Sequence, residues 1–396
     1  MAHSFVQTMT TPDLQSDPWQ WWRSQMPVTQ KWAYLDHAAV GPLSNPAAVA
    51  LQTYADQAAH EGDTVWPQWA ARLDDLRTRF AQLLQAERDE ICLIPNTSTG
   101  INLVAEGFPW QPGDNLIVPD GEFPSNLYPW QNQQSRGVQV RVVPRRDGRV
   151  VVDDLIAQID DSTRIIALSW VGYASGFRAD LESLVARAHE SDVLVFVDAI
   201  QGLGIFDLDL RKIDVDFLAA DGHKWLLGPE GMGVAMIRKR HLQTLRCGNV
   251  GWNSVRNTFN YDQPRLDLRQ SAVRFEPGSA NMSGAAALDA SLQLFSAVRE
   301  AHGPDAIADR VLGLVQEMAD RLGEIGIQTR MDAQPEHRSG IVTFDVPGRE
   351  PATVRQHLID QGCVVSCRGG GIRTGVHAYN NSSDLQQLVA AVASVR

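Results

Sequence analysis

Residues 193–233 read VLVFVDAIQGLGIFDLDLRKIDVDFLAADGHKWLLGPEGMG and contain two short, almost entirely apolar runs, VLVFVDA and DFLAADG. Each run ends abruptly in polar residues, a pattern typical of buried parallel strands that deliver side chains at their carboxyl ends. The first run delivers Asp198, and the second is followed closely by Lys224. Because the carboxyl ends of parallel strands meet at one edge of a sheet, we expect this carboxylate and this amine to share a site.

A lysine beside a strand-end carboxylate is the pair that pyridoxal 5′-phosphate (PLP) requires. The amine forms a Schiff base with the aldehyde of the cofactor, and the carboxylate keeps the pyridine nitrogen protonated. An ordinary surface lysine and an unrelated acidic residue at a strand end would also account for Lys224 and Asp198. On these two residues alone, both interpretations stay open.

Length, charge and the distribution of apolar residues limit the classes of protein to which the chain can belong. A chain of 396 residues suits two domains, or a large domain with a smaller one attached. The formal charge of −12, from 35 basic and 47 acidic residues, provides no basic field for nucleic acid or an anionic membrane surface. No apolar run approaches the roughly 20 residues needed to span a bilayer, and the N-terminus does not read as a secretory signal. We therefore expect a cytoplasmic protein that binds neither nucleic acid nor membrane.

The four cysteines are Cys92, Cys247, Cys363 and Cys367. Scattered through a chain of this length, they suit a reducing cytosol better than a disulfide framework. Cys363 and Cys367 lie four positions apart, but no histidine pair or second cysteine pair completes a zinc set. The sequence therefore predicts no metal site.

Strand-like and helix-like segments alternate through the first two thirds of the chain. ICLIPNTSTGINLVAEGF (91–108) passes from an apolar strand through small hydroxyl residues into a helix, and the N–H groups of such a turn can cap the helix or hold a phosphate. Further strand-like runs follow, and LESLVARAHE is typical of a crossover helix. This alternation predicts an α/β fold with a mostly parallel sheet between helices.

We divide the chain into three parts. A tryptophan-rich N-terminal arm spans 1–30 and is expected to pack onto another surface, with the small domain as one candidate. A large cofactor-binding domain spans 31–284. A smaller α+β domain spans 285–396, with long helices followed by short strands and a final helix.

Seven motifs together resemble one enzyme family, the class V branch of fold type I PLP enzymes. In chain order they are YLDHAAVGP, NTSTGIN, GEFPSNLYPW, VFVDAIQG, ADGHKWLLGPEGMG, RFEPGSANMSG and IRTGVHAYN. This branch holds the cysteine desulfurases, selenocysteine lyases, isopenicillin N epimerase-like proteins and, more distantly, kynureninases. The resemblance covers nearly the whole chain and implies a fold type I PLP-dependent transferase fold, PLP as cofactor and an α-amino acid as substrate.

The resemblance also implies how the cofactor is held. Lys224 would bond to PLP and then move the Cα proton of the substrate, which a desolvated lysine can do because its pKa falls toward the working pH. Asp198 would pair with the pyridine nitrogen, Gln201 would hydrogen-bond the ring hydroxyl, and Phe123 would stack on the ring. The residues implied at the phosphate are Thr97, Ser98 and His223.

Four further residues are implied at the substrate and at the subunit contact. Arg373 matches the arginine that binds the substrate carboxylate, for which a planar guanidinium is suited. His37 and Tyr173 would be further substrate-binding residues. Ser279 matches a position that reaches the phosphate from the neighbouring subunit, which implies a homodimer with sites at its interface.

Three features depart from the desulfurase pattern. Phe123 stands where that branch usually places a histidine over the ring, and a phenyl group cannot pass protons. Only six positions separate Cys367 from Arg373, so the mobile loop that carries the nucleophilic cysteine is missing. Asp221 stands where many relatives have a serine that touches the phosphate, and a carboxylate there would repel it.

We therefore expect a homodimeric, cytoplasmic PLP-dependent lyase that works through a carbanion at Cα. It would eliminate sulfur, selenium or a similar group from Cβ without a persulfide cysteine. The alternatives are epimerisation at Cα as in isopenicillin N epimerase-like proteins, kynureninase-like hydrolysis, transamination, and a non-catalytic interaction module. Fold and cofactor do not choose among the reactions, because the pocket decides which bond is aligned for cleavage.

Overall fold

The structure is a computed structural model and describes residues 13–395. The first twelve residues of the predicted N-terminal arm lie outside the described residues. Within the described range, no helix combines the length and the apolar character needed to cross a bilayer.

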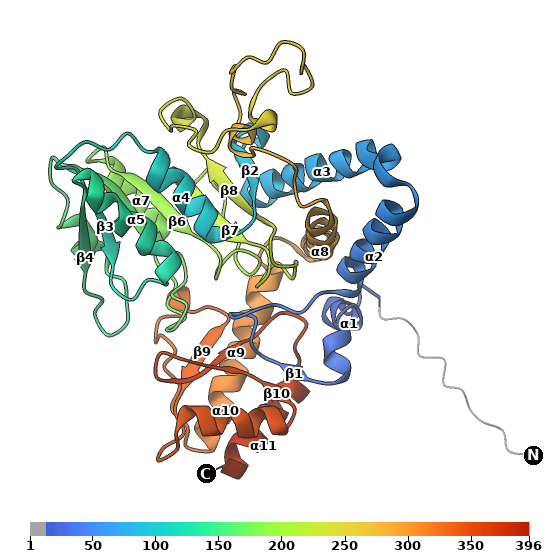
Figure 1. The fold of residues 1–396 in the computed structure, drawn as a ribbon. Coiled ribbons are helices and arrows are strands. Elements are labelled where there is room, and N and C mark those ends of the chain that lie inside the picture. Colours follow the sequence, from blue (N-terminus) through green and yellow to red (C-terminus); the bar gives the residue numbers. More distant parts are fainter. Residues whose placement is uncertain (1–12, 396) are drawn as a thin grey trace, which may run out of the picture.

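A seven-stranded sheet forms the centre of the larger part of the molecule (Figure 1). In order across the sheet, the strands are β2 (Ile91–Ile94), β8 (Gly233–Ile237), β7 (Phe217–Asp221), β6 (Leu194–Asp198), β5 (Thr163–Ser169), β3 (Asn115–Pro119) and β4 (Gln139–Val143). β8 is antiparallel to both of its neighbours, and all the other pairs are parallel. The predicted α/β fold with a mostly parallel sheet is confirmed.

Helices cover both faces of this sheet, so its strands are apolar on both sides. Val195 and Val197 of β6 belong to one buried cluster, and Phe196 between them belongs to another. The first cluster includes residues of α3 (Trp66–Leu84), α6 (Val152–Ile156), α7 (Leu181–His189) and α8 (Met282–His302), and the second includes residues of α4 (Thr97–Gly107) and α5 (Tyr128–Asn132). Burial on two faces explains why VLVFVDA reads as a continuous apolar run.

The C-terminal part contains a small antiparallel sheet with helices, coloured orange to red in Figure 1. Its strands lie in the order β11 (Ser366–Arg368), β12 (Gly371–Gly375) and β9 (Ile341–Phe344), and its helices are α9 (Ala306–Glu324), α10 (Pro351–Asp360) and α11 (Ser382–Val395). The boundary predicted after residue 284 falls inside α8. That helix packs against α2 (Asn45–His60) and α3 as well as against α9.

The described part of the predicted arm packs onto the C-terminal part. α1 (Pro18–Ser24) places Arg23 against α11, where Arg23 Nη1 lies 2.8 Å from Asp384 Oδ2. Trp22 is fully buried and packs edge-on against Phe295, with 4.8 Å between ring centroids. β1 (Ala33–Tyr34) then pairs in parallel with β10 (Cys363–Val364). The chain therefore enters the large sheet only after it has crossed the C-terminal part.

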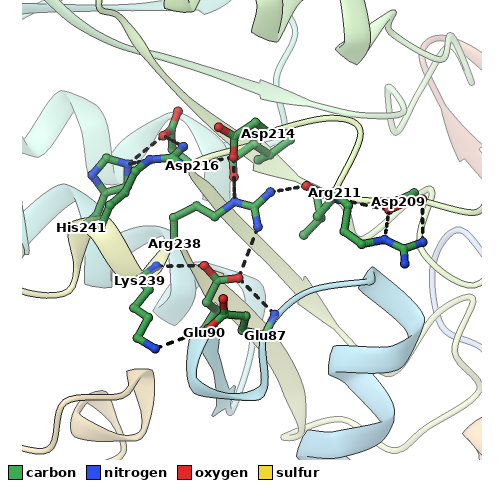
Figure 2. A network of polar contacts seen from close by, with 12 residues as sticks. Glu87, Glu90, Asp209, Arg211, Asp214, Asp216, Arg238, Lys239 and His241 are labelled. Carbon is green, nitrogen blue, oxygen red and sulfur yellow. Dashed lines mark hydrogen bonds and ion pairs between the residues drawn. The ribbon is translucent and has the colours of Figure 1, made fainter.

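A network of ion pairs braces the sheet edge at which β7 begins. Asp216, the residue before β7, is completely buried; its carboxylate lies 2.8 Å from His189 Nε2, 2.7 Å from His241 Nε2 and 2.6 Å from Arg240 Nη2. Figure 2 shows how the network continues through neighbouring charged side chains, among them Asp214, Arg238 and Glu90. These ion pairs therefore lie at the amino end of β7, opposite the end of the sheet at which β6 and β7 finish.

Candidate active site

A cavity of about 350 Å³ lies where the carboxyl ends of β6 and β7 meet strand β12 of the C-terminal part. All of the predicted site residues line this cavity except His37 and Ser279. Those that line it are Thr97, Ser98, Phe123, Tyr173, Asp198, Gln201, His223, Lys224 and Arg373. With Ala38, Ala39 and Val40, the structure brings together residues from six of the seven motifs and from both parts of the chain.

Lys224 and Asp198 face the cavity without pairing to each other. Within residues 13–395, no ion pair or hydrogen bond involves the Lys224 side chain, and its Nζ lies 5.7 Å from the centroid of the Phe123 ring. Burial lowers the pKa of Lys224 to about 8, although the charge of Asp198 acts in the opposite direction. Burial raises the pKa of Asp198 to about 6, and its carboxylate accepts a hydrogen bond from Ile200 N at 3.1 Å. The cavity therefore holds a readily deprotonated amine and a desolvated acid that lacks a cationic hydrogen-bond partner.

The segment between β1 and α2 passes directly over the backbone of the lysine. Gly41 N donates a hydrogen bond to His223 O at 2.6 Å, and a Cβ added at Gly41 would come within 2.2 Å of Lys224 O. Only glycine allows this approach. Gln201 fastens the same segment, since its Nε2 donates to Ala38 O at 2.9 Å. The YLDHAAVGP motif therefore fixes the position of the lysine backbone.

The amino end of α4 closes another wall of the cavity. Thr97 Oγ1 accepts a hydrogen bond from Asp221 N at 2.9 Å, which ties the helix to the end of β7. Ser98 Oγ donates to Ser125 Oγ at 2.7 Å, and both residues line the cavity. Asn96 caps the helix, since its Oδ1 accepts from Thr99 N at 2.9 Å, and the N–H groups of Thr97 and Ser98 at the same end favour an anion. Ser125 was not predicted, although it lies within the GEFPSNLYPW motif.

Phe123 forms an aromatic wall together with Tyr173. Their ring centroids are 5.2 Å apart and the rings meet edge to face. The neighbouring Glu122 accepts hydrogen bonds from Ser169 N at 2.8 Å and Asn126 Nδ2 at 2.9 Å, and so fastens the Phe123 loop to the end of β5. Burial raises the pKa of Glu122 to about 7. Glu122 was not predicted, and its only signal in the sequence was its place in the GEFPSNLYPW motif.

Arg373 is 2% exposed and is held by partners on three sides. Its Nη1 donates to Tyr173 O at 2.9 Å, its Nε donates to Ser366 Oγ at 3.1 Å, and its Nη2 lies 3.3 Å from Asp36 Oδ1. Burial lowers the pKa of Arg373, and the carboxylate of Asp36 offsets this effect. The guanidinium is therefore fixed at the cavity wall in an orientation suited to a carboxylate.

Two predicted residues lie elsewhere. His37 is fully buried behind the cavity, where its Nδ1 lies 2.8 Å from Gly375 O and its Nε2 lies 2.6 Å from Tyr379 Oη. Burial keeps the pKa of His37 well below its ordinary value. Both ring nitrogens are thus engaged by the protein, and the histidine braces β12 rather than lining the cavity. Ser279 is exposed and lines a different hollow, beside Trp252.

The cavity residues fit PLP. Lys224 has a free amine, and Asp198 offers a buried carboxylate. At the phosphate end, the amino terminus of α4 supplies the N–H groups of Thr97 and Ser98, and the imidazole of His223 lines the cavity, with its Nδ1 3.0 Å from Asp221 Oδ2. These groups match the aldehyde, the ring nitrogen and the phosphate of the cofactor.

The comparisons with known proteins agree with this site. Residues 33–388 match the family model described as aminotransferase class V, and the chain belongs to this family of PLP-dependent enzymes. A cysteine desulfurase of Cronobacter sakazakii (strain ATCC BAA-894) is 31% identical to it, over 94% of this chain and 97% of the relative. The predicted family and cofactor are confirmed.

Solved structures show the same fold. The apo structure of a cysteine desulfurase from Thermococcus onnurineus NA1 has a TM-score of 0.87 at 24% identity and covers 98% of this chain and 99% of its own. The cystine C–S lyase C-DES, in complex with its product cysteine persulfide, has a TM-score of 0.85 at 22% identity, covering 93% and 99%. A C-DES mutant with glycine covalently linked to PLP has a TM-score of 0.88 at 22% identity, covering 97% and 99%. The predicted fold type I architecture is confirmed.

Proposed function

We propose that this enzyme is a PLP-dependent lyase that cleaves the C–S bond of a cysteine-type amino acid by β-elimination, without a persulfide cysteine. In the overall reaction the Cα–H and Cβ–S bonds break, the sulfur leaves with its bonding electron pair and takes a proton, and water releases pyruvate and ammonia from the remainder. No oxidant or reductant is needed. The similarity to cysteine desulfurases and to the cystine C–S lyase C-DES supports C–S chemistry.

The observation that carries the proposal is the hairpin formed by β11 and β12. Its register pairs Ser366 with Arg373, Cys367 with Ile372 and Arg368 with Gly371. Because side chains alternate between the faces of a strand, Cys367 points away from the face that presents Arg373. Cys367 instead packs against the buried core, and it does not line the cavity.

The chemical state of the thiols supports the same conclusion. Burial raises the pKa of Cys367, and it raises that of Cys363 to about 12. A thiolate is the nucleophilic form of cysteine, so both residues are poorly suited to accept sulfur from a substrate. A two-residue turn between β11 and β12 leaves no loop that could carry either thiol to the cavity.

The remaining residues have roles in this reaction that follow from their positions. Arg373 binds the α-carboxylate and so orients the Cα–H and Cβ–S bonds. Lys224, whose pKa is about 8, removes the proton from Cα. PLP, when bound, supplies an electron-withdrawing ring, and Asp198 maintains its positive charge. Phe123 packs against Tyr173 at the cavity wall, and its phenyl ring cannot pass a proton to the leaving sulfur.

We also propose that the active form is a homodimer in which Ser279 reaches the cavity of the second copy. Ser279 is exposed, as this role requires. Next to it, a gold loop projects from the molecule (Figure 1), and large apolar side chains in this region are exposed. They include Trp252, Phe259, Tyr261 and Leu266, which are 40–73% exposed. Apolar surface of this extent is typical of an interface.

The test of the proposed reaction is the identity of its products. Holoenzyme is incubated with cystine, cysteine, cysteine sulfinate, selenocysteine and kynurenine, and the products are identified by mass spectrometry. We expect pyruvate and ammonia in equal amounts with the released sulfur or selenium compound. Alanine, a racemised substrate or a keto acid that retains the side chain would instead identify desulfuration, epimerisation or transamination.

A further inference from the structure

We propose that Trp225 is a positioning residue for the cofactor, because it fixes the side-chain amide of Gln201 so that this amide donates a hydrogen bond to the ring oxygen of PLP. The inference concerns cofactor binding and does not depend on the proposed C–S cleavage. Trp225 directly follows Lys224 in the chain. The aldehyde and the hydroxyl of PLP are carried by neighbouring ring carbons, so two neighbouring residues act on two neighbouring groups, Lys224 directly and Trp225 through Gln201.

The amide of Gln201 is held at both of its ends. Trp225 Nε1 donates to Gln201 Oε1 at 2.8 Å, and Gln201 Nε2 donates to Ala38 O at 2.9 Å. An indole N–H can only donate and a backbone carbonyl can only accept, so the amide oxygen must face Trp225 and the amide nitrogen must face Ala38. The two contacts therefore exclude the orientation in which oxygen and nitrogen are exchanged.

The nitrogen end of this amide is the end beside the cavity. Ala38 and Gln201 both line the cavity, whereas Trp225 does not. Nε2 carries two hydrogens, and within residues 13–395 only one of them has an acceptor, Ala38 O. The other hydrogen is available to an acceptor in the cavity. The ring oxygen of PLP is such an acceptor, most strongly when it is ionised.

The indole of Trp225 is itself held rigidly. It is fully buried, and it stacks on the rings of His37 and His377 with centroid distances of 5.8 and 6.2 Å. His377 Nε2 also lies 3.1 Å from Trp225 O. On another side, a Cβ added at Gly340 would lie only 2.8 Å from Trp225 Cη2. An indole packed this closely cannot follow a side chain that turns away, so Trp225 sets the position of the Gln201 amide.

Loss of the indole N–H would leave Gln201 Oε1 without its donor. Gln201 is 2% exposed, so little water can reach its side chain. A buried carbonyl oxygen without a hydrogen bond is costly, and the amide gains by turning toward another donor. Its N–H would then no longer be held toward the cavity. The effect of Trp225 on the cofactor should therefore require the presence of Gln201.

The test compares PLP with its analogue in which hydrogen replaces the ring hydroxyl. Calorimetry gives the Kd of each for the full-length apoprotein, and the ratio of the two values reports on the ring oxygen, because all other groups of the cofactor are common to both. The variants are Trp225→Phe, Gln201→Leu, the two combined, and Trp110→Phe. Trp110 is the control, since it is 5% exposed, its Nε1 donates to Ala105 O at 2.8 Å, and it does not line the cavity.

We expect the parent and Trp110→Phe to share the same preference for PLP over the analogue. In Trp225→Phe this preference should fall by about fivefold to tenfold, the size expected for a hydrogen bond to a charged oxygen. Gln201→Leu should lose at least as much, and the combined variant should lose no more than Gln201→Leu alone. A preference in Trp225→Phe equal to that of the parent, an equal fall in Trp110→Phe, or a further fall in the combined variant would overturn the inference.

A second replacement of Trp225 separates its hydrogen bond from its packing. The amino acid 3-benzothienylalanine, introduced at position 225 by stop-codon suppression, keeps the shape of the indole and has sulfur in place of the N–H. It should lower the preference for PLP as Trp225→Phe does, and it keeps the test open if Trp225→Phe does not fold. A preference equal to that of the parent would show that Trp225 acts by packing alone and would reject the inference.

Discussion

Asp221 Oδ2 lies 3.0 Å from His223 Nδ1, so the carboxylate at the end of β7 is directed to the imidazole. The sequence left Asp221 without an explanation, because a carboxylate beside a phosphate is repulsive. The imidazole of His223 is thus the immediate neighbour of the Asp221 carboxylate, and both residues line the cavity. The contact makes Asp221 a partner of His223, with Thr97 holding its backbone N–H.

Replacement of Asp221 by Asn should weaken the binding of PLP by about tenfold, since the imidazole of His223 loses the carboxylate that lies against it. The amide keeps the size of the side chain, so the fold should not change. The Kd of PLP for the apoprotein, measured by the visible absorbance of the bound cofactor, tests this. Tighter binding in Asp221→Asn would show that the carboxylate acts on the phosphate directly.

The pH dependence of cofactor uptake should report on Lys224. Only the neutral amine can attack the aldehyde, and burial lowers the pKa of Lys224 to about 8. The rate of PLP uptake by the apoprotein should therefore rise with pH, with a half-point near pH 8.

Asp198→Asn should move that half-point lower still, because the charge of Asp198 raises the pKa of Lys224. In Lys224→Ala the visible absorbance of the lysine-bound cofactor should be absent at every pH. An unchanged spectrum in that variant would mean that another lysine binds PLP.

Asp216→Asn should destabilise the fold by about 3 kcal/mol at pH 7, because a buried charge network loses its central carboxylate. Burial alone would raise the pKa of Asp216, but hydrogen bonds from His241 and His189 outweigh burial and hold this pKa well below its ordinary value. The stabilisation is therefore present above the unfolded pKa of about 4 and is lost as the pH falls further.

Urea unfolding of the holoenzyme at pH 7 and at pH 3.5 measures this difference in the free energy of unfolding. The difference in the free energy of unfolding between the parent and Asp216→Asn should be smaller at pH 3.5 than at pH 7. Asp214→Asn is the control, because Asp214 belongs to the same network (Figure 2) but its side chain is 52% exposed. If Asp214→Asn lost as much stability as Asp216→Asn, Asp216 would not be the residue on which the stability of the network depends.

The sheet and its cofactor-bearing edge could be predicted because their signals are local. Strands buried on both faces read as continuous apolar runs, and the polar residues that end them, Asp198 and those around Lys224, must lie at one edge. The boundary inside α8 had no such signal. One continuous helix packs against elements of both parts of the molecule, and its sequence contains no glycine or proline after Gly284 that would mark a boundary.

The position of His37 depends on contacts between distant parts of the chain. His37 lies beside a cavity-lining segment, but its ring turns to Gly375 and Tyr379, more than 330 positions away. A sequence alone gives no signal for such a contact.

The proposed reaction differs from that of a desulfurase in that this enzyme cleaves the C–S bond without storing sulfur on a cysteine. The most direct test is mass spectrometry of the intact holoenzyme after turnover with cysteine or cystine, with alkylation to trap a persulfide, together with the kcat of Cys367→Ser. We predict no added sulfur on Cys367 and a kcat within about twofold of the parent, since a role in packing contributes little to rate. A persulfide on Cys367, together with loss of turnover in Cys367→Ser, would contradict the account.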